Sequence, residues 1–331
     1  MWGVSLLGFQ MVDPAVKQLK PHCTFEQQLT LLKERGLQVA DDALALKVLE
    51  RLGYYRLSGY FYPLRRTNPV GEPGRQDQFQ DGASFELVVE LADFDKKLRL
   101  LSLYALETIE VAVRVAVAHR LGKVHAEAHL DSKYLDGKFT KVYPNQNQSA
   151  YNDWRQRFRT ACEGAKDDFV QHHRTNYGGR MPVWVAVELW DFGLLSRFFA
   201  GMQVRDQSVI AHQYGLSDGL VLKSWMRTFN FVRNVAAHHS RLWNRTLPDT
   251  PVLPPLERCR WIEVLHKDPR AHSKMFGALT CMRLMVRAIA PHSDWHQLMK
   301  AHICTFPPND HIKIESAGFP IGWESLPIWA D

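Results

Sequence analysis

The stretch from Met226 to Arg245 contains the side chains best suited to acid–base chemistry. Its centre, residues 233–238, reads Arg-Asn-Val-Ala-Ala-His, an R-N-x-x-x-H string. Histidine has an unperturbed pKa of about 6.5, which suits proton transfer near neutral pH. An arginine beside it can neutralise a phosphate and the extra charge of a pentacoordinate transition state. Arg233 and His238 together suit cleavage of RNA, because RNA supplies its own 2′-hydroxyl nucleophile and the step requires no metal. The residues alone equally allow a structural role, in which Arg233 pairs with a carboxylate and His238 caps a helix end.

The spacing around this string predicts a helix over residues 226–245 with two different faces. One face is apolar and is expected to be buried. The opposite face is polar and cationic and contains no acid. Because an exposed helix face usually carries charges of both signs, this one is expected to contact an anionic ligand. The apolar stripe comprises Trp225, Phe229, Val232 and Ala236, and the polar stripe comprises Arg227, Asn230, Asn234, His238 and Arg241.

Arg233 does not share the direction of His238 on this helix. Asn234 and His238 are four residues apart and point the same way, whereas Arg233 is offset from His238 by about 140°. Either the length of the arginine side chain closes this gap, or two copies of the helix meet at a two-fold axis and build a joint site. The second arrangement predicts a site at a dimer seam.

The rest of the chain predicts helices and few other elements. No stretch shows period-2 alternation and no repeat of 20–50 residues occurs, so the fold class is expected to be all-α. Residues 1–82 are expected to form an N-terminal helical region packed on the core, and residues 83–331 one helical domain. Residues 65–82 and 122–148 are predicted to be loops. Helices are expected over residues 24–36, 42–52, 85–121, 151–177, 183–199, 206–215, 218–245, 256–267, 273–290 and 292–304.

Two further groups of residues have both a structural and a functional interpretation. The long helix over 85–121 is apolar on almost every side, so charges within it need partners. The residues concerned are Glu107, Glu110, Arg114 and His119. They either include a buried ion pair that fixes the register of the helix or support the helix that carries Arg233 and His238. The aromatic stretch from Tyr54 to Pro63 is interpreted as a packed corner rather than a base-stacking platform.

The sequence lacks the motifs of several common classes of enzyme. No phosphate-binding glycine loop, H-E-x-x-H string or G-x-S-x-G elbow is present. His292 and His296 are spaced as a helical metal pair but have no evident third ligand, so no metal and no cofactor are expected. The net charge of +6 favours polyanionic partners.

The expected location is the cytoplasm. The five cysteines are far apart and suggest a reducing compartment. No run approaches the roughly 20 apolar residues of a membrane span. Residues Met1 to Gln10 lack a basic region and a cleavage site, so no signal peptide is expected.

Six blocks in this order resemble the Abi (abortive infection, AbiD/AbiF-type) family of bacterial phage-defence proteins, which belongs to the HEPN superfamily. They are residues 20–29 (KPHCTFEQQL), 54–60 (YYRLSGY), 94–99 (FDKKLR), 106–110 (LETIE), 233–244 (RNVAAHHSRLWN) and 318–320 (GFP) with Trp323. The resemblance implies a HEPN-like helical bundle with additional N-terminal and C-terminal helices, present as a homodimer. It also implies that the family's ribonuclease signature maps onto Arg233, Asn234 and His238. Ala236 departs from many relatives, which have cysteine there.

The resemblance and the residues together give the leading expectation, a metal-independent endoribonuclease that acts as a toxin-like effector of phage defence. His238 would be the general acid and base, Arg233 the phosphate clamp and Asn234 an orienting residue. Arg227, His239, Arg241 and Arg245 would bind the RNA backbone, and Glu107, Glu110, Arg114 and His119 would support the site. One alternative is a non-catalytic protein that holds a small structured RNA. Another is a structural dimer whose polar stripe is the subunit interface.

Overall fold

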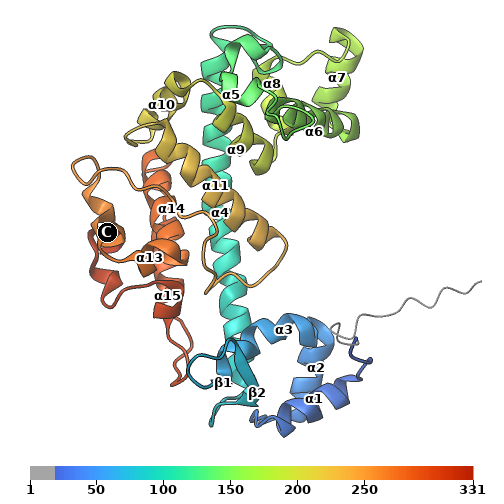
Figure 1. Ribbon diagram of the computed structural model, residues 1–331, viewed down its shortest axis with the longest axis vertical. Coiled ribbons are helices and arrows are strands. Elements are labelled where there is room, and N and C mark those ends of the chain that lie inside the picture. Colours follow the sequence, from blue (N-terminus) through green and yellow to red (C-terminus); the bar gives the residue numbers. More distant parts are fainter. Residues whose placement is uncertain (1–18, 331) are drawn as a thin grey trace, which may run out of the picture.

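One helix, α4 (Phe85–Gly122), runs through almost the whole length of the molecule (Figure 1). The computed structural model describes residues 19–330, so the expectation for Met1–Gln10 lies outside the described residues. The Ser84 side chain accepts a hydrogen bond from the Leu87 amide and caps α4, as such N-terminal residues do. The helix is buried on several sides because other helices pack along it, which explains its nearly continuous apolar sequence. The prediction of this helix is confirmed, and so is the all-α class.

The N-terminal region packs around the first end of α4 (Figure 1). Thr24 and Gln27 form the capping box of the first helix, and Asp41 caps the second. Residues 65–82, predicted to be a loop, instead contain a small antiparallel pair of strands. The Asp77 carboxylate connects the two strands because it forms an ion pair with Arg65. Arg35 forms an ion pair with the same carboxylate. The elements are α1 (Phe25–Glu34), α2 (Asp42–Leu52), α3 (Tyr54–Phe61), β1 (Arg65–Thr67) and β2 (Arg75–Phe79).

The aromatic stretch in α3 is mainly packing, as the sequence suggested. Leu57, Tyr60 and Phe61 are buried, and the Phe61 ring lies 6.0 Å from the ring of Phe85 at the start of α4. Tyr55 is 92% exposed and contributes no such packing. The apolar core therefore continues from α3 into α4, across the boundary expected near residue 82.

The opposite end of α4 is covered by shorter helices than the sequence predicted (Figure 1). The expected helix over 151–177 is two helices separated at Ala165–Asp167, and the second ends at Gly178 in the left-handed conformation. The expected helix over 183–199 is also interrupted, because Asp191 caps a new helix by accepting a hydrogen bond from the Leu194 amide. The helices here are α5 (Gly137–Thr140), α6 (Ala150–Gly164), α7 (Asp168–Tyr177), α8 (Val183–Ala186) and α9 (Phe192–Gly201).

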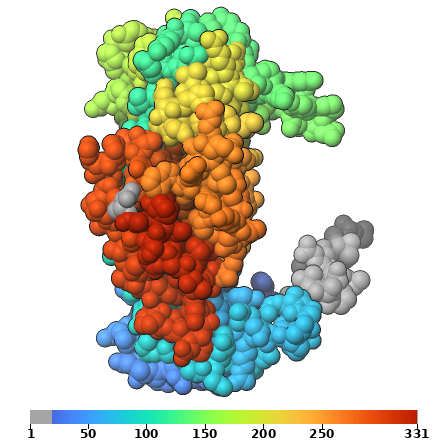
Figure 2. Space-filling model, turned by 90° about the vertical axis from the view of Figure 1, so that its left-hand side faces the viewer, coloured from blue at the N-terminus to red at the C-terminus, as the bar shows by residue number. Residues whose placement is uncertain are grey.

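The C-terminal third of the chain covers the middle of the molecule, between the N-terminal region and residues near 150–210 (Figure 2). The expected helix over 256–267 begins later than predicted, because residues 256–259 are a turn and only 260–267 are helical. The expected start of a helix at His292 is wrong, because the last long helix begins at Trp295, so His292 and His296 do not share a helix. Among the described residues no group of three potential metal ligands occurs, and no helix is long and apolar enough to cross a membrane. From residue 204 onward the helices are α10 (Val204–Gln213), α11 (Gly219–Ala237), α12 (Glu263–Lys267), α13 (Pro269–Ser273), α14 (Met275–Ile289), α15 (Trp295–Ile303) and α16 (Pro327–Ala330).

Candidate functional site

Helix α11 carries the candidate site and packs against α4. Asp218 caps its N-terminus by accepting hydrogen bonds from the Leu220 and Val221 amides. The predicted apolar stripe is confirmed, because each of its four side chains is at most 1% exposed. The polar stripe lies on the other side of the helix, so the periodicity of the sequence correctly separated the two faces.

The prediction that this helix continues to Arg245 is wrong, because α11 ends at Ala237. His238 is the C-cap residue, and His239 follows with φ 57°, in the left-handed region. The Ser240 amide donates to the Val235 carbonyl, and the His239 amide donates to the Ala236 carbonyl. This is a Schellman ending, here with histidine in the place that glycine usually takes. The imidazole of His238 therefore stands at the exposed end of the helix instead of in its middle.

The segment that follows the C-cap of α11 is held by a buried carboxylate, that of Asp95 in α4. Its oxygens accept hydrogen bonds from the Leu242 amide at 2.9 Å, the Trp243 amide at 2.8 Å and the Tyr60 hydroxyl at 2.7 Å. Arg99, one turn further along α4, pairs with the same carboxylate at 2.7 Å. Burial raises the pKa of Asp95, and the Arg99 guanidinium opposes that rise. Residues from α3, α4 and the turn after His238 thus meet at one carboxylate.

Helix α3 fixes the same turn from its outer side. Arg56 Nη1 donates to the His239 carbonyl at 3.0 Å, and Arg241 Nη1 donates to the Gly59 carbonyl at 2.6 Å. Burial lowers the pKa of Arg241. The expectation that Arg241 continues the outer stripe is therefore wrong: it faces α3 because the helix has already ended. His239 contributes its backbone to this turn, and its side chain is exposed.

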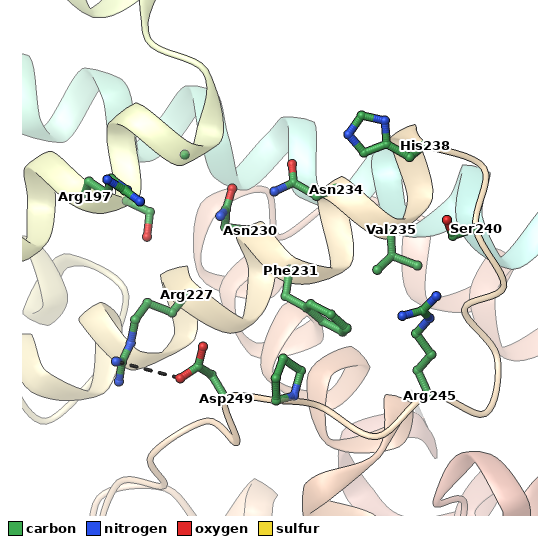
Figure 3. Close-up of a pocket in the computed structure, with 13 residues that line it drawn as sticks. Arg197, Arg227, Asn230, Phe231, Asn234, Val235, His238, Ser240, Arg245 and Asp249 are labelled. Atoms are coloured by element: carbon green, nitrogen blue, oxygen red, sulfur yellow. Dashed lines mark ion pairs between the residues drawn. The ribbon is translucent and has the colours of Figure 1, made fainter. Parts of the chain in front are cut away.

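Most of the polar stripe lines one cleft of about 530 Å³ (Figure 3). Arg197 and Arg227 lie at one end, and His238 and Arg245 lie at the other. The side-chain amides of Asn230 and Asn234 lie between these ends. The structure thus brings four predicted site residues together, namely Arg227, Asn234, His238 and Arg245.

The charge of this cleft is predominantly positive. Among the described residues, Asp249 is the only carboxylate that lines it, and its oxygen lies 3.8 Å from the Arg227 guanidinium. Three guanidinium groups and one imidazole also line the cleft. Oδ1 of Asn230 is buried beside this cleft and has no hydrogen-bond partner among the described residues. The cleft suits a ligand with phosphate groups and hydroxyl donors.

Arg233 lines a different, smaller cleft of about 340 Å³, together with Glu107, Glu110 and Arg114 of α4. Arg114 pairs with Glu110 and also donates from Nε to the Trp190 carbonyl at 3.0 Å. Burial raises the pKa of Glu110, and the Arg114 and Arg233 guanidinium groups oppose that rise. The ion pair is therefore present, and Arg233 lies beside it. Arg233 Nη1 lies 3.4 Å from Asn234 Oδ1. Because Asn234 lines the larger cleft, this contact connects the two clefts.

Three placements were not predicted from the sequence. Arg197 was missed, although a single arginine within the apolar run of α9 was a detectable signal. Asp249 was also missed, because it lies in the proline-rich segment that returns past α11. His119 is exposed in a third hollow beside Lys123 and Trp184, so the structure does not bring it to either cleft.

The fold and the site together define a helical protein with a cationic cleft at the end of a helix that bears R-N-x-x-x-H. The chain belongs to the Abi-like protein family, whose model matches residues 47–244. The match begins in α2 and ends just after Trp243, so it contains Asp95, α11 and the turn held by α3. This membership links the chain to abortive infection, a form of phage defence. No curated protein and no solved structure matches the chain.

Proposed function

We propose that this protein is a metal-independent endoribonuclease that acts in abortive infection. The observation that carries the proposal is the cleft in which the His238 imidazole shares its end with the Arg245 guanidinium. An imidazole can move protons at neutral pH, and a guanidinium can neutralise a phosphate and the charge of its transition state. A cleft with three guanidinium groups and one carboxylate favours a polyanion such as RNA.

In this mechanism His238 accepts the proton of a ribose 2′-hydroxyl, whose oxygen attacks the neighbouring phosphorus. The bond from phosphorus to the 5′-oxygen of the next nucleotide breaks, and that oxygen takes up a proton. The products carry a 2′,3′-cyclic phosphate and a 5′-hydroxyl. Arg245 neutralises the phosphate in the cleft, and Asn234 orients the substrate. His238 is exposed at the C-cap of α11 and is therefore accessible to such a substrate.

The place of Arg233 supports a site completed by a homodimer. Arg233 lines the cleft on α4 rather than the cleft of His238. Beside it, α4 exposes large apolar side chains that nothing in the described residues covers: Leu100, Tyr104, Val111 and Val115 are each between 43% and 60% exposed. Such a stripe on a central helix is typical of an interaction surface.

The spacing of this stripe fits a second copy of the chain. An antiparallel pair of α4 helices about a two-fold axis level with Val113 would place Val111 of one copy opposite Val115 of the other. The same axis would place Glu107 opposite His119, which are opposite in charge when the histidine is protonated. It would place Tyr104 opposite Gly122, over which the half-exposed Trp184 indole lies. Both Arg233 clefts would then lie beside the seam.

The decisive experiment compares the wild type with His238→Ala and Arg233→Ala on total RNA and maps the cut ends. Each substitution is expected to reduce cleavage by about a hundredfold or more, because His238→Ala removes the proton acceptor and Arg233→Ala removes the second phosphate cation, which the partner copy would supply. Cleavage should persist in EDTA. His292→Ala is the matched control, because His292 is also exposed and lies outside the cleft. Cleavage by His238→Ala at the wild-type rate, or loss of cleavage in EDTA, would contradict the mechanism.

A second candidate function is RNA binding without catalysis. The observation that favours it is the separation of Arg233 and His238 into different clefts within one chain. This candidate predicts salt-sensitive RNA binding that survives His238→Ala, with no cleavage by the wild type.

A further inference from the structure

The cationic cleft does not end at Arg197, because this side chain also lines a second cavity of about 430 Å³. The second cavity contains Lys138 of α5 and Lys223 of α11. Within the part of the chain that the structure describes, its one carboxylate belongs to Asp136, which accepts a hydrogen bond from the Lys138 amide at 2.7 Å. Two cavities of the same sign of charge therefore meet at one arginine.

A single face of α11 lines both cavities. Lys223 precedes Arg227 by four residues, and Asn230, Asn234 and His238 follow at helical spacing. His238 follows Lys223 by 15 positions, so the face between them is about 22 Å long at a rise of about 1.5 Å per residue. This length exceeds a single nucleotide, so a ligand that occupied the whole face would be a chain of several nucleotides.

The far wall of the second cavity is fixed in place. The Phe139 ring occupies the space in which a Cβ atom at residue 201 would stand, so it packs directly on Gly201 of α9. The Asp136 amide donates to the Gly201 carbonyl at 2.9 Å. These contacts hold α5 against α9 and place Lys138 at the same cavity as Arg197.

The second cavity also has apolar walls. Val204 and Leu220 line it and are 55% and 60% exposed, and the half-buried Phe139 lies beside them. Cations beside exposed apolar and aromatic surface suit an unpaired nucleotide, whose phosphate needs charge and whose base needs apolar contact. A duplex would keep its bases stacked inside and would leave these apolar walls unused.

We infer that Lys138, Arg197 and Lys223 form an extended subsite for single-stranded RNA, which continues from the His238 cleft along α11. The inference rests on the proposed RNA substrate. It assigns the second cavity to nucleotides several positions away from the scissile phosphate. Long RNA chains should therefore bind more tightly than short ones, because only long chains reach the lysines.

The test measures RNA binding by fluorescence anisotropy in the full-length His238→Ala protein, which leaves the RNA intact. A labelled dodecanucleotide and a trinucleotide are compared with and without the additional changes Lys138→Ala and Lys223→Ala. The dodecanucleotide is expected to bind about tenfold more weakly to the lysine variant at moderate salt. The slope of log affinity against log salt should fall by about 1.4, which is the value for two lost phosphate contacts on a single strand. The advantage of the dodecanucleotide over the trinucleotide should shrink accordingly.

The matched control removes two exposed lysines outside both cavities, Lys47 and Lys96, and should leave the affinity and the salt slope unchanged. Circular dichroism establishes that each variant is folded. A lysine variant that binds the dodecanucleotide as tightly as its parent overturns the inference, and so does a duplex that binds as tightly as the single strand. If wild type binds RNA through these lysines but never cuts it, the subsite stands and the nuclease proposal fails. If the protein binds no RNA, both fail.

Discussion

At the scale of the residue, Asp95 explains why three of the sequence blocks occur together. Tyr60 belongs to the YYRLSGY block, Asp95 and Arg99 to the FDKKLR block, and Leu242 and Trp243 to the block that bears R-N-x-x-x-H. All of them meet at the Asp95 carboxylate. These blocks therefore have a structural role as well as any catalytic one: they hold the turn that begins at His238.

Replacing Asp95 by alanine is expected to lower the free energy of unfolding by about 3–5 kcal/mol. The change would leave the buried Arg99 charge without its carboxylate and the Leu242 and Trp243 amides without their acceptor. Urea unfolding followed by circular dichroism measures this loss. Asp93→Ala is the control, because Asp93 is exposed on the same helix and its removal should change stability by no more than about 0.5 kcal/mol. Equal losses for the two variants would show that the buried network does not stabilise the fold.

At the scale of the element, two faces of α4 contribute to the proposed site. One side packs against α11 and places Glu110 and Arg114 beside Arg233. The adjoining stripe carries Val111 and Val115 at the surface. If two copies pair along this stripe, one helix would both support Arg233 and bring it to the seam.

Replacing Val111 and Val115 together by glutamate is expected to convert the proposed dimer into monomers and to abolish the proposed cleavage. Two charges on each copy would face each other across an apolar seam, and their desolvation would disfavour pairing. Analytical ultracentrifugation measures the oligomeric state. Val124→Glu is the control, because Val124 is 61% exposed just beyond the end of α4 and outside the stripe. A wild type that is monomeric at all accessible concentrations would contradict the seam.

Mixing two inactive variants tests whether the seam builds the site. If Arg233 of one copy acts with His238 of the other, a mixed dimer of Arg233→Ala and His238→Ala regains one intact site of two. Half of randomly assorted dimers are mixed, so about a quarter of the wild-type rate should return. Absence of any recovered cleavage would place both residues of the site in one chain.

At the scale of the whole molecule, two buried histidines should make stability dependent on pH. The His129 ring is buried among Phe158 and Trp190, and the His302 ring stacks on Phe94 at 4.4 Å and bonds from Nε2 to the Phe94 carbonyl. Burial lowers the pKa of each to about 4. The unfolded chain takes up these protons near pH 6.5, whereas the folded chain excludes them until about pH 4.

Stability should therefore fall as the pH drops from about 6.5 to about 4, by up to about 1.4 kcal/mol per pH unit for each histidine within that window. Above pH 6.5 this contribution is fully present. Urea midpoints measured across the window test the slope. His302→Gln keeps a donor for the Phe94 carbonyl but removes the titration, so its slope should be shallower, whereas His292→Gln, at an exposed site, should match the wild type. An unchanged slope in His302→Gln would contradict the assignment.

The sequence by itself determined the features that depend on local periodicity. The spacing of apolar residues separated the buried and polar faces of α11, located α4 and defined the fold as helical. The offset of Arg233 from His238 also followed from helical geometry alone, and the two side chains do line different clefts. These features need only the rise and turn of a helix, which every residue in it obeys.

Only the tertiary structure decided where α11 ends and what faces its polar stripe. The helix stops at Ala237 because Asp95, 147 residues away from Leu242, captures the amides that a longer helix would have used. Arg241 consequently turns toward α3, and Arg245 reaches the cleft from an irregular segment. Arg197 and Asp249 join the cleft from other parts of the chain. Local spacing cannot predict such partners, since a hydrogen-bond acceptor distant in sequence becomes available only when the chain has packed.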